Sequence, residues 1–372
     1  MKIGIVTLPL HANYGGVLQA YALQTILKRM GYQVEHIQPK VIYPKLHPTW
    51  KMPLVWTKRA FRKFLGGESP LPIFMHPKKW VRKNADKFIR ENINCYFVGE
   101  SNWDKKITKN YDAVVFGSDQ VWRPQYAIPI EKYFGDFLGD SQIKRISYSA
   151  SFGTEINEFT EEQIRKCGEL LSKFSAVSVR EKSGVEKCKT LFGVESKWLI
   201  DPTMLLSKED YSNLYKKTSI PRFQGEIGVY ILDRNANIEQ KLEQLSRKIG
   251  KTLFTMNSKY ENLNAPIVER FQPPVEQWLR AFDDAEYIIT DSFHACVFSI
   301  LFNKPFVCIG NKSRGNARFD SLLGLFGLEF RLVEELSDIE EKILIPIDWD
   351  RVNKILKEKR KEANEFIVNA LK

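Results

Sequence analysis

Short apolar runs alternate with amphipathic stretches along most of this 372-residue chain. The apolar run at 2–8 predicts a strand. Apolar residues then recur every three or four positions over 16–30, which predicts a helix, and a second apolar run at 32–37 predicts another strand. Two strands joined by a helix form a βαβ unit with a right-handed connection, so the sequence predicts a parallel sheet near the N-terminus.

The same alternation continues to the C-terminus. Further strands are expected at 112–116, 145–150, 176–179, 197–200, 227–232, 253–256, 287–290 and 306–309. Further helices are expected at 183–192, 238–249, 274–282, 293–302 and 349–371. This order predicts an α/β protein in which two Rossmann-like, doubly wound domains face a cleft. We place the domains at 1–205 and 206–348, and the helix within 349–372 could pack back on the N-terminal domain.

Residues 39–77 interrupt the alternation and make up most of a basic-aromatic insertion at 40–90. The segment is rich in proline and aromatic residues and contains 13 basic but only two acidic residues, so its net charge equals the +11 of the whole chain. We expect an inserted loop region with one short helix near 56–65. A solvated cationic face is one interpretation. Contact with an anionic membrane or a lipid-diphosphate-linked glycan is the second, because basic and aromatic residues are interleaved. Nucleic-acid binding is the least favoured, because no binding motif accompanies the charge.

The rest of the composition is that of an ordinary globular protein, with 43% hydrophobic and 27% charged residues. No apolar run is long enough to cross a bilayer, and the first residues resemble a strand rather than a secretory signal. The five cysteines are scattered without CxxC spacing, which favours reduced, buried thiols. We therefore expect a cytoplasmic protein, which the basic segment could bring to the inner face of the membrane.

In doubly wound sheets, ligands bind beyond the carboxyl ends of the strands, so the residues after each predicted strand are candidates for a site. Asn13, Gly15 and Gly16 follow the first strand and open a helix, whose backbone N–H groups could hold a phosphate or a carboxylate. The same residues fit a plain turn equally well. They match neither the GxGxxG dinucleotide motif nor a Walker loop.

Four polar or aromatic residues follow the strand at 112–116, namely Ser118, Asp119, Gln120 and Trp122. Their hydroxyl, carboxylate, amide and indole groups suit hydrogen bonding and stacking to a sugar, so we take them as candidate acceptor-binding residues. A helix N-cap formed by the serine or the aspartate is the alternative. Arg180 follows another strand, where it could clamp an anion or simply pair with Glu181.

The strand at 287–290 is followed by Ser292 and His294. The histidine lies in the first turn of an apolar helix at the lip of the predicted cleft, where acid–base chemistry needs a titratable group. A core histidine bonded to a backbone carbonyl is the alternative. The loop after the next strand contains Arg314 and Arg318 among glycines, a composition that suits an anion-binding loop.

Six of these segments together resemble the polysaccharide pyruvyl transferase family. They are residues 13–20, 117–122, 178–181, 200–203, 291–294 and 314–319, in this order and at strand ends. The resemblance implies a fold like the two-domain GT-B glycosyltransferases. It also implies that phosphoenolpyruvate is the donor, that the acceptor is a sugar of a polysaccharide such as a capsule or exopolysaccharide, or of its lipid-linked precursor, and that the product is a cyclic pyruvate ketal.

The resemblance implies that His294 is the catalytic acid, because relatives end an Arg-x-His motif with this histidine. Here Ser292 stands in place of the arginine, so another cation must replace it, and Arg314 and Arg318 are the candidates. The expected donor-binding residues are Asn13, Gly15, Gly16, Arg180, Ser292, Arg314 and Arg318. We expect no metal and no cofactor besides the donor substrate, because no metal-ligand motif is present.

Two other functions stay open at this stage. The first is a GT-B glycosyltransferase that uses a nucleotide sugar, whose diphosphate the basic loop at 312–318 could bind. The second is a glycan-binding or assembly protein that kept the fold without the catalysis.

Overall fold

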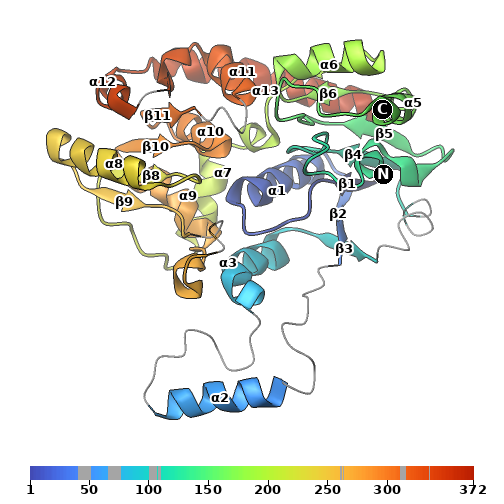
Figure 1. Cartoon of the computed structure of the whole chain (residues 1–372). Helices are drawn as coiled ribbons and strands as arrows, with labels where there is room; N and C mark the ends of the chain where they lie inside the picture. Colours follow the sequence, from blue (N-terminus) through green and yellow to red (C-terminus); the bar gives the residue numbers. More distant parts are fainter. Residues whose placement is uncertain are drawn as a thin grey trace.

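The computed structural model of the chain describes residues 1–40, 52–65, 77–99, 107, 110–259, 262, 264–310, 316–334 and 336–372. These residues form two α/β halves, each built on a parallel five-stranded sheet, as Figure 1 shows. The fold class predicted from the sequence is therefore confirmed.

The N-terminal sheet has the strand order β3-β2-β1-β4-β5. Its strands are β1 (Lys2–Val6), β2 (Gln33–Pro39), β3 (Cys95–Val98), β4 (Ala113–Phe116) and β5 (Lys144–Ser147). The helices of this half are α1 (Tyr14–Arg29), α2 (Met52–Phe64), α3 (Pro77–Asn92), α5 (Glu161–Leu171) and α6 (Lys182–Phe192). A parallel pair, β6 (Ser178–Val179) and β7 (Lys197–Trp198), lies beside β5 through single bridges.

The C-terminal sheet has the order β12-β11-β10-β8-β9. Its strands are β8 (Ile227–Tyr230), β9 (Leu253–Thr255), β10 (Tyr287–Thr290), β11 (Phe306–Ile309) and β12 (Leu332–Val333). The helices that follow the first half are α7 (Lys208–Lys216), α8 (Ala236–Ile249), α9 (Val275–Asp284), α10 (Phe293–Leu301), α11 (Ala317–Phe326), α12 (Ile339–Leu344) and α13 (Trp349–Leu371). None of the described helices is long and apolar enough to span a bilayer.

Local sequence explains where several helices begin and end. Asn13 caps α1, because its side-chain oxygen accepts the backbone N–H of Gly16 at 3.1 Å. Thr160 and Gln163 form a reciprocal capping box at the start of α5. Gly250 ends α8 in the left-handed conformation that glycine adopts without strain. For α1 and α8 these signals lie close to the boundaries that the hydrophobic pattern predicts, whereas α5 was not predicted.

The basic segment contains more regular structure than the sequence predicted. Its short helix is present as α2, and the structure adds α3 and the adjacent β3, neither of which was predicted. α3 packs on the N-terminal half through Val81, Phe88 and Ile89, which are at most 8% exposed. Its apolar stripe is narrow and lies among lysines and arginines, so composition concealed the helical periodicity.

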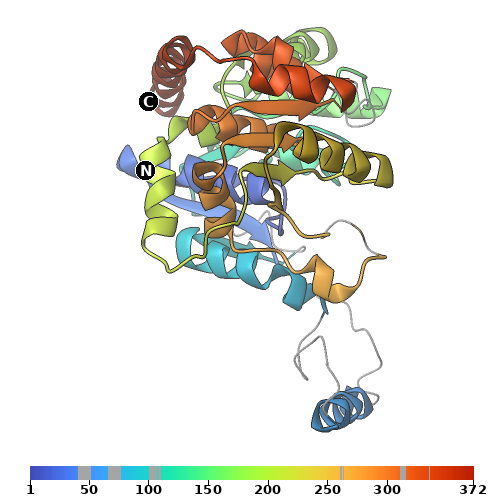
Figure 2. The same cartoon turned by 90° about the vertical axis from the view of Figure 1, so that its left-hand side faces the viewer.

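The two halves share one core and are tied by polar contacts. The Tyr14 ring stacks on Trp278 with 5.2 Å between the ring centroids, and its hydroxyl donates to the carbonyl of Pro273 at 2.9 Å. The final helix, α13, returns to the N-terminal sheet, where Phe366 contacts Tyr148 with 6.5 Å between centroids. Figures 1 and 2 both place the chain termini on the same side of the molecule. The carboxyl ends of the two sheets are thus held in a fixed relation.

Candidate active site

A buried carboxylate, Asp201, lies at the centre of the candidate site. Its side chain follows β7 and is 2% exposed. One oxygen, Oδ1, accepts the backbone N–H and the hydroxyl of Thr203 at 2.9 and 2.7 Å. The other, Oδ2, accepts Nη1 of Arg180 at 2.9 Å and the hydroxyl of Ser118 at 3.2 Å. These donors fix the position of the carboxylate before any ligand arrives.

His294, from the C-terminal half, lies next to this carboxylate. The residue lies in the first turn of α10 and is 8% exposed, with Nε2 3.6 Å from Oδ2 of Asp201. That separation is longer than a hydrogen bond and fits an electrostatic contact. The other side of the ring faces α1, where a Cβ atom on Gly15 would lie 2.1 Å from Nδ1. A glycine is therefore required at this point, and the ring is held between the start of α1 and Asp201.

The surroundings of Asp201 keep it ionised. Burial acts to raise its pKa, but the contacts with His294, Arg180 and Thr203 outweigh burial and hold the pKa well below its usual value. A permanently charged carboxylate next to an imidazole orients the ring. The pair thus has the composition of an acid–base centre.

Two arginines lie near the ring of Phe293, the residue before the histidine. The guanidinium carbon of Arg180 is 4.6 Å from the ring centroid and that of Arg318 is 6.0 Å away. Among the described residues, Nε of each arginine has no hydrogen-bond partner. Burial, followed by the charge of Arg180, lowers the pKa of Arg318 to about 10. Two cations that destabilise one another in this way would both be stabilised by an anion between or beside them.

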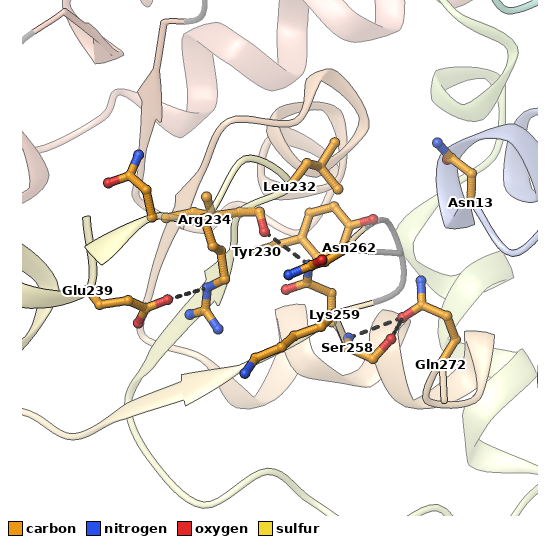
Figure 3. A pocket seen from close by; sticks show the side chains of 12 residues that line it. Asn13, Tyr230, Leu232, Arg234, Glu239, Ser258, Lys259, Asn262 and Gln272 are labelled. Carbon is orange, nitrogen blue, oxygen red and sulfur yellow. Dashed lines mark hydrogen bonds and ion pairs between the residues drawn. The ribbon is translucent and has the colours of Figure 1, made fainter. Parts of the chain in front are cut away.

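A cavity of about 260 Å³ opens beside this centre, at the carboxyl ends of β8 and β9 (Figure 3). Most of its lining residues have polar side chains, although apolar atoms also contribute to its surface; the lining comprises Asn13, Tyr230, Ile231, Leu232, Arg234, Asn235, Glu239, Asn257, Ser258, Lys259, Asn262 and Gln272. His294 is not part of the lining. The cavity and the histidine are nevertheless neighbours, because Asn13 lines the cavity two residues before Gly15.

Asp291 connects the cavity wall to the strand that carries the histidine. Its carboxylate oxygens accept the backbone N–H groups of Leu232 and Asp233 at 2.8 and 2.9 Å. The end of β10 is therefore fastened to the loop after β8. Ser292 begins α10, and its backbone N–H donates to the hydroxyl of Thr290 at 3.0 Å. The loop geometry thus fixes both the histidine and one wall of the cavity.

Most of the predicted donor-binding residues lie around His294. Gly15 packs against the histidine ring, and Arg180 donates to Asp201, the carboxylate beside that ring. Arg318 lies near Phe293. Gly16 and Asn13 form the cap of α1. Arg314 lies outside the described residues.

The predicted acceptor-binding set is only partly suited to that role. Trp122 is 0% exposed, stacks on Phe134 and donates Nε1–H to the carbonyl of Tyr133, so its predicted stacking on a sugar is wrong. Ser118 is also 0% exposed and is engaged by Asp201, so its predicted contact with a sugar is wrong as well.

Gln120 and Asp119 complete this set. The side-chain oxygen of Gln120 accepts Nη1 of Arg123 at 3.2 Å, and Asp119 lies 3.6 Å from Nη2 of Arg180. Asp119 is partly exposed, and a Cβ atom on Gly16 would lie 3.6 Å from its Oδ2. Asp119 is therefore the member of the set placed nearest to the candidate site.

The sequence contained Asp201 within a family-like segment but did not identify it as a site residue. The signal was an aspartate followed by proline and threonine at the end of an apolar strand, a place where ligands bind in such sheets. Within the described parts of the chain, no three His, Cys, Asp or Glu side chains gather as they would to hold a metal ion.

Comparison with known proteins decides the family. The family model of polysaccharide pyruvyl transferases matches residues 13–313. The chain belongs to the polysaccharide pyruvyl transferase family. The family transfers pyruvyl groups to polysaccharides, and this is the general activity of the present pyruvyl transferase. No curated protein matches the sequence.

Solved structures resemble this pyruvyl transferase in fold. The UDP-GlcNAc 2-epimerase from Neisseria meningitidis bound to UDP-GlcNAc has a TM-score of 0.50 at 10% identity, over 100% of this chain and 99% of that one. A UGT transferase from Siraitia grosvenorii in complex with UDP has a TM-score of 0.48 at 8% identity, over 100% of both chains. The two parallel five-stranded sheets, together with the likeness to the epimerase, show a GT-B-like pairing of two Rossmann-like domains.

Proposed function

We propose that this enzyme transfers the pyruvyl group of phosphoenolpyruvate to two hydroxyls of one sugar, forms a cyclic ketal and uses His294 as the general acid. The acceptor is a sugar of a polysaccharide or of its lipid-linked precursor. The observation that carries the proposal is the placement of His294 against the ionised Asp201, at the point where the carboxyl ends of both sheets meet.

The reaction begins at the methylene carbon of the donor. Protonated His294 gives its proton to that carbon, which becomes a methyl group, and positive charge develops at the neighbouring carbon. The two sugar hydroxyls form two new C–O bonds to this carbon, while the bond to the phosphate oxygen breaks. Of the two hydroxyl protons, one replaces the proton on the histidine and one leaves with the phosphate. Asp201 stays charged throughout and acts as a positioning residue.

The cations near Phe293 support an anionic donor. Phosphoenolpyruvate carries a phosphate and a carboxylate, and Arg318 has an Nε–H group without a hydrogen-bond partner among the described residues. Arg180 already neutralises Asp201, so it contributes less additional charge to the donor site. Arg318 is therefore our candidate, among the described residues, for the cation that substitutes for the arginine missing at Ser292.

The polar cavity supports a sugar as the second substrate. Amide and hydroxyl side chains such as Asn257, Ser258 and Gln272 offer both donors and acceptors, which neutral sugar hydroxyls require. The carbonyl oxygen of Asn257 has no partner among the described residues and is available for such a bond. We assign the acceptor to this cavity.

Donor dependence tests the proposal. The purified enzyme is incubated with phosphoenolpyruvate and a panel of defined oligosaccharides, and acceptor mass and released phosphate are measured. We expect one acceptor to gain the mass of a pyruvate ketal, with one phosphate released per ketal. Growth of the acceptor with UDP-glucose or another nucleotide sugar, and an unchanged mass with phosphoenolpyruvate, would show a glycosyltransferase instead. Glycan binding without either reaction would favour an assembly protein.

A further inference from the structure

Helix α2 stands away from both domains. Figures 1 and 2, at right angles to one another, show it at a distance from the two sheets, joined to β2 and α3 by segments outside the described residues. Among its described side chains, none is buried. A 13-residue helix of this kind is marginal in water by itself, so its stability requires a surface to pack against.

The two sides of α2 differ sharply in chemistry. At 100° per residue, its aromatic residues and leucines gather on one half of the helix, and its basic side chains gather on the other half, where Met52 and Val55 also lie. The apolar side comprises Leu54, Trp56, Ala60, Phe61, Phe64 and Leu65, where Leu65 directly follows the helix. The basic side comprises Lys58, Arg59 and Arg62. No acidic residue occurs between Met52 and Leu65.

The apolar side is exposed to an unusual degree. Leu54, Phe61 and Leu65 are 65%, 63% and 66% exposed, and Phe64 is 86% exposed. Four large apolar side chains in contact with water on one helical face are typical of a binding surface. The rest of the basic segment adds positive charge before and after α2 in the sequence, because residues 40–90 contain 13 basic and two acidic residues. The complementary surface must therefore be both apolar and strongly anionic.

We propose that α2 is an interfacial helix that docks this enzyme on an anionic phospholipid bilayer. Its apolar side enters the boundary between headgroups and acyl chains, and its basic side stays with the phosphates. The separation of the two chemistries favours a bilayer over single-stranded nucleic acid, which requires aromatic and cationic side chains on the same face. The proposal does not depend on the identity of the donor, so it can fail while the proposed reaction stands.

Vesicle flotation of the full-length protein tests the proposal. Vesicles of phosphatidylcholine alone are compared with vesicles that contain phosphatidylcholine and phosphatidylglycerol. We expect binding to the anionic vesicles, weakened by salt, and much weaker binding to the neutral ones. Phe61→Ser together with Phe64→Ser should lower the partition coefficient about tenfold or more. Lys58→Glu together with Arg62→Glu should lower it by a similar factor on anionic vesicles only.

Matched variants elsewhere on the surface serve as controls. Ile128→Ser with Ile156→Ser removes two apolar side chains that are 77% and 73% exposed. Lys189→Glu with Arg247→Glu makes the same charge change at exposed ion pairs. Both controls should bind vesicles as the unaltered protein does. Equal binding to neutral and anionic vesicles, no binding, or equal loss in the control variants would overturn the proposal. So would binding of an oligonucleotide that α2 variants abolish while vesicle binding is absent.

Discussion

The two sheets have the same parallel architecture, but the residues at their carboxyl ends serve different purposes. In the N-terminal half these residues bond to one another: Ser118, Arg180 and Thr203 all donate to Asp201, and little of the group contacts solvent. In the C-terminal half the ends of β8 and β9 line an open polar cavity. Under the proposed reaction, the N-terminal half supplies fixed charges, and the C-terminal half supplies the proton of His294 and the surface that binds the acceptor.

The largest expected effect comes from breaking the N-terminal network. Asp201→Asn removes the closer of the two carboxylates beside the buried Arg180, so we expect a loss of about 3–5 kcal/mol in the free energy of unfolding. The matched control is Asp210→Asn, which breaks the more exposed pair with Arg29 and should cost no more than about 1 kcal/mol. Urea unfolding at neutral pH measures both. Equal effects would mean that the buried network has no special role.

Asp201→Asn should also change how the free energy of unfolding depends on pH. Because the folded-state pKa of Asp201 lies below the unfolded value, its stabilisation is present above about pH 4 and is lost as the pH falls further. The unaltered protein should therefore lose stability in acid more steeply than Asp201→Asn.

Gly15 tests how closely the two halves approach. Gly15→Ala places a methyl group 2.1 Å from Nδ1 of His294, so the ring must move. We expect kcat/KM to fall about 100-fold, because a displaced catalytic group loses its alignment with the substrate. Gly16→Ala is the matched control, since the nearest atom to its Cβ would be 3.6 Å away. Full activity in Gly15→Ala would show that the position of the ring is not critical.

His36 is a buried polar residue of the N-terminal sheet, and its ring makes one hydrogen bond within the described residues. Its Nε2 bonds to the carbonyl of Ala20 at 3.0 Å, and burial lowers its pKa to about 4. The neutral form is thus favoured in the folded state, and stability is retained above pH 6.5 and lost as the pH falls towards 4.

For this reason His36→Gln, which retains a donor, should remove on the order of 2 kcal/mol of the stability change between pH 7 and pH 5. Unfolding free energies across that range provide the test, and an unchanged pH slope would show that His36 is not the group that titrates.

The smallest effect is expected at the cavity. Asn257→Ala removes from the wall a carbonyl oxygen that has no partner in the part of the chain that the structure describes, so we expect KM for the sugar to rise about tenfold with kcat little changed. Asn364→Ala on α13, whose side-chain oxygen also lacks a partner among the described residues, is the control and should leave KM unaltered. A fall in kcat alone would place the cavity in the chemistry rather than in acceptor binding.

Hydrophobic periodicity predicted four of the five strands in each sheet, because buried parallel strands are nearly continuous apolar runs, and it missed β3 and β12 at the sheet edges. β10 and β11 begin and end at the predicted residues. α3 was missed because its buried stripe is narrow and surrounded by charge. Strand-end placement brought Gly15 and His294 to the same place, but the sequence could not show that Asp201 reaches the histidine from the other half.

The two residues wrongly predicted to bind the acceptor illustrate what the sequence alone does not show. Trp122 and Ser118 follow a strand as ligand-binding residues do, yet both side chains turn inward. Sequence gives the position of a residue along the chain, whereas the direction of its side chain depends on packing between segments far apart. Ser118 and Asp201, for example, are 83 residues apart and bond at 3.2 Å.

The central claim is that His294 protonates the donor, and a single kinetic comparison tests it most directly. Ketal formation from phosphoenolpyruvate is measured for the unaltered enzyme and for His294→Gln, with binding of phosphoenolpyruvate and melting temperature measured in parallel. The account predicts that kcat falls about 10²–10⁴-fold while the fold and donor binding are retained. A His294→Gln enzyme that forms the ketal at an undiminished rate would contradict it.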